Sequence, residues 1–333
     1  MRALASVGIA AILVGAAPAL AQQAPAGATP EEQPFAAGKP LGVTVEDAFT
    51  PMSDNVKVYG ALVNAESCSY DETRGLIVAV NRGANQDQVP NDGFTSLMNP
   101  DGSVHTSKWT GVDRNGLVLN HPFGSDIQHG KLYVADRDGG LAEGEETISV
   151  IRMFDMETGA PAGEIKNEES TGFNDIEVAP GGTIYATQTG SGDENPDKTT
   201  WRVFRIAPDG AASVLIEGDP LNRPNGIAID NDGNLVVVNI GNDEVLTFSP
   251  EGELLGTENA AQPGNDGIVI LPDGTKYVSS VRQGGVSRIR PGEAAELIAT
   301  GIPSTASMCY DSGANQLVIP MNPNNSLAFV PLD

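Results

Sequence analysis

Cysteine, histidine and positive charge are all scarce in this chain of 333 residues. It has two cysteines and three histidines, and 19 Lys+Arg stand against 44 Asp+Glu. A formal net charge of −25 repels the phosphate backbone of nucleic acids and anionic lipid heads, so neither is an expected partner. The absence of a CxxC or Cys/His zinc spacing, together with so few histidines, argues against a metal site built from these residues.

Only one long apolar run is present, and it lies at the N-terminus. Residues 1–21 read MRALASVGIAAILVGAAPALA, in which Arg2 precedes an apolar stretch that ends in the small-x-small site Ala19 to Ala21. This pattern predicts a secretory signal peptide, with a short buried helix as the alternative, and an exported protein that is periplasmic or secreted. Residues 22–42 are rich in Pro, Ala and Gln, which predicts a disordered lead-in. No later segment is apolar enough to span a bilayer.

Turn residues, by contrast, are abundant: the chain has 39 glycines and 23 prolines. With 40% hydrophobic residues, this favours a packed core of many short strands over a helical bundle. One motif recurs, two alternating apolar stretches joined by a Gly turn, and its clearest copy is PNGIAIDNDGNLVVVNIGNDEVLTFSPEGELLGT from Pro224. Its first strands align at positions 66, 125, 174, 225, 266 and 306.

Six units of four short strands predict an all-β fold, a six-bladed β-propeller of four-stranded blades that occupies residues 43–333. Only 27 residues follow Ala306, enough for three strands, so Val56 to Leu62 is expected to join the last blade and close the ring. A sandwich would not repeat one motif six times, and a solenoid would not need a borrowed strand. Closure brings Cys68 and Cys309 onto neighbouring blades, where a disulfide or, as the simpler interpretation, two buried thiols would fit.

The first strands of a propeller line its central channel, so residues at the same point of each repeat converge at one channel mouth. We expect there the residues that begin the six first strands: Glu66, Ser125, Asn174, Asn225, Asp266 and Ala306. Four of the six carry a carboxylate or carboxamide, and oxygen ligands of mixed charge suit a hard divalent cation. The alternative is that these residues only cap strands and turns.

The motifs RPNGIAID, FNDIEV and NDGIVILPDG resemble the gluconolactonase, senescence-marker-protein and luciferin-regenerating-enzyme family of six-bladed propellers, over roughly residues 60–331. The resemblance implies metal ligands at Asn225 in the Pro-Asn-Gly strand and at Asp266 in the Asp-Gly strand. It also implies a ligand at Glu66, where SCSY replaces the family's usual Gly-Pro-x-Trp context. Asn174 matches an asparagine that coordinates the metal or orients the substrate.

These residues together predict metal-assisted hydrolysis of a small ester, in particular a lactone, by a monomeric enzyme with a small-molecule substrate. Asp266 is the candidate to activate water, because a carboxylate at a metal can both ligate and take a proton. Ca²⁺ suits the ligand types best, with Zn²⁺, Mg²⁺ and Mn²⁺ as alternatives. No GxSxG motif is present, which argues against a serine nucleophile. Residues that follow or end second strands are candidates to line the pocket: Arg82, Gln188, Asn239 and Arg282.

Two other functions stay open at this stage. A Pro-Asn-Gly strand also occurs in non-enzymatic propellers, so a binding or scaffold propeller is an alternative. A propeller lyase would need a histidine base near the ring, and His121 is the only candidate. The simpler interpretation of His121 is an exposed loop residue. Substrate identity depends on the loops at residues 82–93, 136–146 and 189–199, whose conformation the sequence does not determine.

Overall fold

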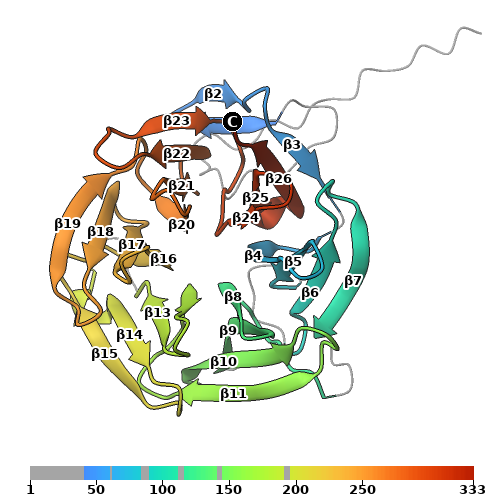
Figure 1. Ribbon diagram of the computed structural model, residues 1–333, viewed down its shortest axis with the longest axis vertical. Coiled ribbons are helices and arrows are strands. Elements are labelled where there is room, and N and C mark those ends of the chain that lie inside the picture. The colour runs from blue at the N-terminus through green and yellow to red at the C-terminus, as the bar shows by residue number, and fades with distance from the viewer. Residues whose placement is uncertain (1–40, 61, 84–89, 112–115, 141–144, 191–195) are drawn as a thin grey trace, which may run out of the picture.

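The computed structural model describes residues 41–60, 62–83, 90–111, 116–140, 145–190 and 196–333. Six antiparallel sheets of four strands surround a central channel (Figure 1), which confirms the predicted six-bladed β-propeller. Helix within these residues is limited to two 3₁₀ turns, η2 (Lys198–Thr200) and η3 (Asn322–Asn324). No helix in the described ranges has the length and apolar character needed to cross a membrane.

Each blade runs from an inner strand at the channel to an outer strand at the rim. Blade 1 contains β4 (Ala65–Asp71), β5 (Leu76–Asn81), β6 (Phe94–Met98) and β7 (Val104–Gly111). Blade 2 contains β8 (Ser125–Gln128), β9 (Lys131–Gly139), β10 (Thr147–Asp155) and β11 (Pro161–Asn167). Blade 3 contains β12 (Ile176–Val178), β13 (Ile184–Gln188), β14 (Arg202–Ile206) and β15 (Ala212–Glu217). Blade 4 contains β16 (Pro224–Ile229), β17 (Leu235–Asn239), β18 (Glu244–Phe248) and β19 (Leu254–Asn259). Blade 5 contains β20 (Asn265–Ile270), β21 (Lys276–Ser280), β22 (Gly285–Ile289) and β23 (Glu296–Ala299).

Blade 6 closes the ring with strands from both ends of the chain. It contains β24 (Cys309–Asp311), β25 (Gln316–Met321), β26 (Ser326–Pro331) and, as its outer strand, β3 (Lys57–Tyr59). The pairs Leu327 with Tyr59 and Phe329 with Lys57 fix the register. The prediction that the segment from Val56 to Leu62 supplies the fourth strand is confirmed, and Figure 1 shows β3 beside β26.

A disulfide links the same two blades at the channel side. Cys68 on β4 is bonded to Cys309 on β24, across 241 residues of sequence. The simpler interpretation of two buried thiols was wrong. Both cysteines lie on innermost strands, and ring closure brings their Cα atoms to 5.4 Å, within the range that a disulfide spans.

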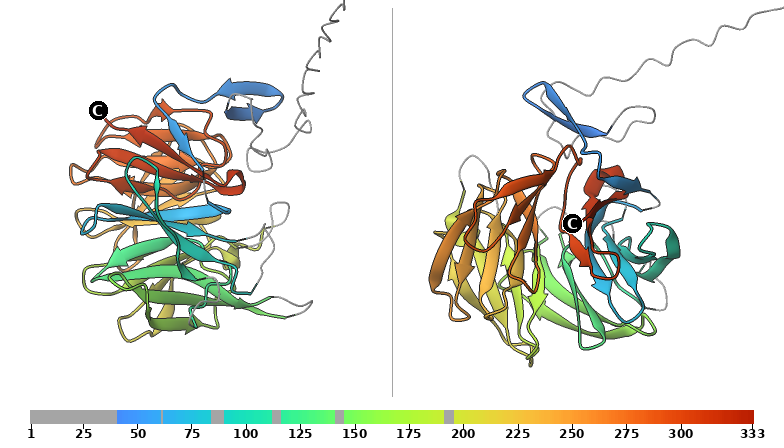
Figure 2. Two further views of the ribbon diagram at one scale, coloured as in Figure 1. Left: turned by 90° about the vertical axis from the view of Figure 1, so that its right-hand side faces the viewer. Right: turned by 45° about the horizontal axis from the view of Figure 1, so that its top comes forward.

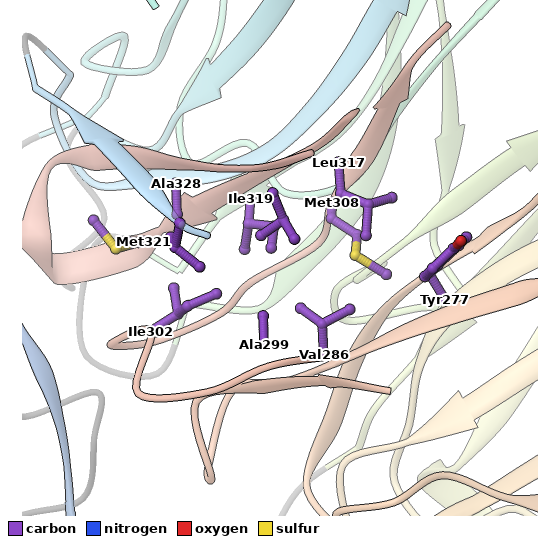
Figure 3. Packing of buried hydrophobic residues seen from close by; sticks show 11 residues of the cluster. Tyr277, Val286, Ala299, Ile302, Met308, Leu317, Ile319, Met321 and Ala328 are labelled. Carbon is purple, nitrogen blue, oxygen red and sulfur yellow. The ribbon is translucent and has the colours of Figure 1, made fainter. Parts of the chain in front are cut away.

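The hydrophobic cores lie between blades, because the middle strands bury both of their faces. Along β17, Leu235 and Val237 pack toward one neighbouring blade, whereas Val236 and Val238 pack toward the other. This explains why such strands read as continuous apolar runs. Figure 3 shows the cluster between blades 5 and 6, which includes Tyr277, Val286, Ala299, Ile302, Met308, Leu317, Ile319, Met321 and Ala328.

The structure adds a hairpin that the sequence did not predict. Strands β1 (Gly42–Val45) and β2 (Ala48–Pro51) pair with each other outside the ring, beside β23 (Figures 1 and 2). Both turn residues between them have positive φ, as a tight two-residue hairpin requires. Ser53 Oγ accepts the Thr300 N–H at 2.6 Å, which fastens the hairpin to blade 5. Residues 1–40, which include the predicted signal peptide and most of the lead-in, lie outside the described residues.

Candidate functional site

Backbone pairing defines which residue of each first strand occupies the same point of the channel mouth. We call the residue at this point the ring residue of its blade. Three ring residues donate their backbone N–H to a carbonyl of the second strand: Phe123 to Ala135, Asn174 to Thr187, and Ala306 to Pro320. The other three each follow the residue that pairs with the end of the second strand: Glu66 after Ala65, Asn225 after Pro224, and Asp266 after Asn265.

Phe123, and not Ser125, therefore takes the ring position in blade 2. Ser125 lies two residues further along and pairs with Val134. The prediction failed because the alternating apolar pattern of this blade begins only at residue 125. The segment before it already follows the strand, since Phe123 and Gly124 both exchange backbone hydrogen bonds with Ala135.

Asn225 and Asp266 contact each other on neighbouring blades. Asn225 Nδ2 donates a hydrogen bond to Asp266 Oδ2 at 3.3 Å, and both residues are buried. Because the amide nitrogen is turned to the carboxylate, the amide oxygen is directed elsewhere, and this buried Oδ1 has no partner among the described residues. A buried acceptor without a partner costs about 1–3 kcal/mol, so this atom marks a place for a donor or a cation.

Glu66 is held at the same mouth by two neighbours. Arg82 Nη1 donates to Glu66 Oε2 at 3.2 Å, and Asn322 Nδ2 of η3 donates to the same oxygen. Asn322 Oδ1 is a second buried amide oxygen without a partner in the described part of the chain. Asn174 is half-buried, and its carbonyl accepts the Gly124 N–H. The structure thus joins Asn225 to Asp266 directly and ties Glu66 to blade 6.

His121 is buried beside this group, so its interpretation as an exposed loop residue was wrong. Arg82 Nε donates to His121 Nε2 at 2.8 Å, and the backbone N–H of His121 donates to Asp136 Oδ1 at 2.7 Å. Burial, followed by the positive charges of Arg82 and Arg137, lowers the pKa of His121 to about 2. The imidazole is therefore neutral, and the lone pair of its Nε2 is already engaged. A lyase base at the mouth is not supplied by this residue.

Comparison with known proteins identifies the family of this propeller. Residues 65–320 match the SMP-30/Gluconolactonase/LRE-like region, which is most of the propeller and contains every ring residue. The chain belongs to the SMP-30/gluconolactonase/LRE-like family. No curated protein sequence matches it. Family membership confirms the predicted resemblance and supports a lactonase-type function.

Solved structures of low sequence identity share the fold of this family member. A gluconolactonase from Xanthomonas campestris is 19% identical, with 93% of this chain and 99% of that chain covered and a TM-score of 0.59. Virginiamycin B lyase from Staphylococcus aureus is 13% identical, with 84% and 100% covered and a TM-score of 0.55. At these identities the structural similarity shows the propeller fold alone. The chemistry of this chain is inferred from the residues at its mouth.

The predicted pocket residues at the ends of second strands mostly fasten loops in this family member. Asn239 Oδ1 accepts the Asn222 N–H at 3.0 Å. Gln188 Oε1 accepts from Ser170 Oγ at 2.8 Å, and its Nε2 donates to the Thr200 carbonyl at 2.7 Å. Equivalent bonds run from Val63 N to Asn81 Oδ1 and from His121 N to Asp136 Oδ1. Each of these side-chain oxygens holds the segment that enters the first strand of its own blade. Arg282 is exposed in the loop after β21.

Below the mouth, three carboxyl groups that the sequence analysis did not single out line the channel. Asp126, Asp175 and Glu177 border a cavity of about 210 Å³ that is lined by first strands. Asp126 Oδ2 accepts the Val178 N–H at 2.9 Å and Asp175 Oδ2 accepts the Ile227 N–H at 3.1 Å, so each carboxyl binds the next blade. Within the described ranges, no three His, Cys, Asp or Glu residues are grouped to hold a metal ion.

The pKa values of these channel carboxyls are raised, because burial disfavours their charged forms. Burial raises the pKa of Asp175 to about 7, with further contributions from Asp126 and Glu66. Burial, then repulsion by Asp126 and Asp175, raises the pKa of Glu177 well above its usual value, and burial also raises that of Asp126. The channel therefore holds protons near neutral pH.

Asp175→Asn is expected to stabilise the protein at alkaline pH. The folded-state pKa of about 7 exceeds the ordinary value of 3.8, so the stability contributed by the bound proton is complete below pH 3.8 and is lost as the pH rises through 7. An amide cannot ionise and can still accept the Ile227 N–H. In urea unfolding with a chelator present, we expect the gain at pH 8.5 to exceed the gain at pH 5 by an amount on the order of 2–3 kcal/mol.

The exposed Asp209→Asn, in a turn of the same blade, is the matched control and should show no such dependence. An equal effect of Asp175→Asn at both pH values would contradict a buried, protonated Asp175.

Proposed function

We propose that this family member is an exported, monomeric enzyme that hydrolyses a lactone or another small ester at the channel mouth, with a divalent cation. One observation carries the proposal: a buried amide oxygen of Asn225 has no partner among the described residues, beside the buried carboxylate of Asp266. In a family that supports lactonase-type chemistry, this is the arrangement that a cation would complete.

The residues at the mouth fit such an ion. Glu66, Asn225 and Asp266 would hold it, with Asn174 as a fourth ligand or a substrate contact. All four offer oxygen atoms, which favours Ca²⁺ and allows Mg²⁺, Mn²⁺ or Zn²⁺. When bound, the cation supplies a Lewis acid that polarises the ester carbonyl. The bonds from Arg82 and Asn322 to Glu66 keep that carboxylate oriented at the mouth.

The chain's own groups supply the proton transfers. Asp266 takes a proton from water, whose oxygen attacks the carbonyl carbon of the lactone. The bond from that carbon to the ring oxygen breaks, and the ring oxygen receives the proton, so lactone and water give a hydroxy acid. Asn225 Nδ2 holds the carboxylate of Asp266 in place by a hydrogen bond to its Oδ2. Asn174 would donate an amide hydrogen bond to the substrate.

Export is supported by the disulfide between Cys68 and Cys309, because structural disulfides persist in oxidising compartments. Together with the predicted signal peptide at residues 1–21, this favours the periplasm or the extracellular space.

Metal removal tests the proposal. Chelator-treated protein is expected to hydrolyse a panel of γ- and δ-lactones and linear esters at least about tenfold more slowly than untreated protein, because a bound cation contributes several kcal/mol of charge stabilisation. Ca²⁺ should restore the rate, and elemental analysis should find one divalent ion per chain. Circular dichroism before and after chelation controls for unfolding. Full activity after chelation would contradict metal dependence, and inactivity of the untreated protein on every substrate would favour a binding propeller.

A further inference from the structure

We propose that Arg82 and Arg137 form an anion-binding subsite beside the ring, and that the substrate is a lactone bearing its own carboxylate. The inference rests on the proposed function and names the substrate class of the same site. Two neighbouring blades carry an arginine at an equivalent position. Arg82 follows Asn81, and Arg137 follows Asp136. Asn81 and Asp136 are the residues whose side chains hold the segments that enter the first strands of blades 1 and 2.

The guanidinium groups of Arg82 and Arg137 both contact the aromatic side chain of Phe123. Arg82 Cζ is 4.5 Å and Arg137 Cζ is 4.4 Å from the centroid of Phe123. The two carbons are therefore no more than 8.9 Å apart, the sum of these distances. Two positive charges this close repel each other, and a bound anion would relieve that repulsion. Phe123 and His121 position them, because His121 Nε2 accepts the hydrogen bond from Arg82 Nε.

The carboxylates nearby attract Arg137 but form their ion pairs with other arginines. Glu66 forms its ion pair with Arg82, and Asp136 binds Arg152 Nε at 2.6 Å as well as backbone N–H groups. Within the described residues, Arg137 has no ion pair, and its buried Nε has no hydrogen-bond acceptor. Burial, and then repulsion by Arg82, lowers the pKa of Arg137 to about 10. In a chain of net charge −25, two adjacent guanidinium groups held in this way indicate an anionic ligand.

Arg137 also lies close to the segment that leads to Asn174. A side chain on Gly172 would begin 3.7 Å from Arg137 Nη2, at ordinary van der Waals distance. Gly172 lies two residues before Asn174 in the segment that enters β12. Arg137 therefore adjoins both Phe123 and the approach to a candidate substrate ligand.

The anion is a group of the substrate, distinct from the acid that hydrolysis creates. The new carboxylate forms at the reacting carbonyl, beside Asn225 and Asp266 on blades 4 and 5. Arg82 and Arg137 belong to blades 1 and 2. A lactone with a carboxylate substituent would place its carbonyl beside Asn225 and Asp266 and its carboxylate at the two arginines. Guanidinium groups bind carboxylates through two parallel hydrogen bonds.

A matched pair of lactones tests the subsite: 5-oxotetrahydrofuran-2-carboxylate and the corresponding 2-carboxamide. For Arg137→Gln we expect KM for the carboxylate to rise about 10- to 100-fold, the range for a lost charge-assisted hydrogen bond. Its kcat, and both constants for the amide, should stay within about twofold to threefold. Arg137→Lys should recover part of the affinity, because it restores the charge without the fork. Arg205→Gln, which removes an exposed arginine of blade 3, is the control.

Binding of glutarate, measured by calorimetry on wild type and Arg137→Gln, is independent of turnover. We expect wild type to bind it and the variant to bind at least tenfold more weakly. Equal losses on both lactones, or a wild-type enzyme without preference for the carboxylate, would overturn the subsite while leaving the lactonase proposal intact. If the wild-type protein hydrolyses no lactone, the proposed function fails, and the glutarate measurement alone tests the subsite. Weaker binding of glutarate to the variant than to the wild type would support the subsite. No binding of glutarate to the wild type would overturn it.

Discussion

Asp266→Asn is expected to lower lactone hydrolysis by about 10²- to 10⁴-fold, the usual contribution of a general base. An amide cannot take a proton from water, and it binds a cation more weakly than a carboxylate. The fold should persist, because the change is isosteric and an asparagine can still accept from Asn225 Nδ2. Turnover would be measured with excess Ca²⁺, so that weaker metal binding does not account for the loss.

Asp273→Asn is the matched control for that variant. It makes the same substitution in an exposed turn of the same blade, where an asparagine oxygen can accept the Thr275 N–H as Asp273 does now. Its rate should equal that of wild type. If Asp266→Asn kept more than about a tenth of wild-type turnover, the loss would be smaller than a general base provides, and Asp266 would be a structural ligand only.

Loss of the disulfide is expected to produce the largest change in stability. The bond between Cys68 and Cys309 closes a loop of 241 residues, and the chain-entropy relation gives a stabilisation on the order of 5 kcal/mol for a loop of this length. It also joins blades 1 and 6, where the ring is otherwise closed by the short strand β3. The double variant Cys68→Ala/Cys309→Ala should therefore unfold at clearly lower urea concentration than the wild type.

Reduced wild-type protein shows how much stability the covalent bond contributes apart from the packing of the two side chains. It retains both sulfur atoms and lacks only the bond, so it should lose most of the same stability. Thiol labelling of the unfolded chain before reduction should detect no free cysteine. Equal unfolding midpoints for oxidised and reduced wild type would show that hydrogen bonding and packing alone hold the ring closed.

The propeller could be predicted from the sequence because its signals are local and repeated. Alternating apolar stretches such as GIAID specify short strands, glycine turns specify their pairing, and six copies specify the number of blades. Counting residues after Ala306 was enough to predict the strand that β3 supplies. The equivalent positions of Asn225 and Asp266 in the repeat also predicted that they lie close together, because each blade presents the same point of its first strand to the channel.

The remaining features of the mouth depend on contacts between residues from different blades. Ser125 was placed where Phe123 lies, because a segment without apolar alternation can still follow the strand. Neither the burial of His121 nor the approach of Arg137 to Arg82 has a local signal, since both depend on how loops of blades 1 and 2 pack over Phe123.

The sequence by itself determined the number of blades, the closing strand and the equivalent positions of Asn225 and Asp266, since each follows from a pattern repeated along the chain. Only the tertiary structure decided the disulfide between Cys68 and Cys309, the raised pKa of Asp175 and the pairing of Glu66 with Arg82. Those properties depend on distance and burial across blades, and no periodicity in one blade encodes the side chains that the next blade places against it.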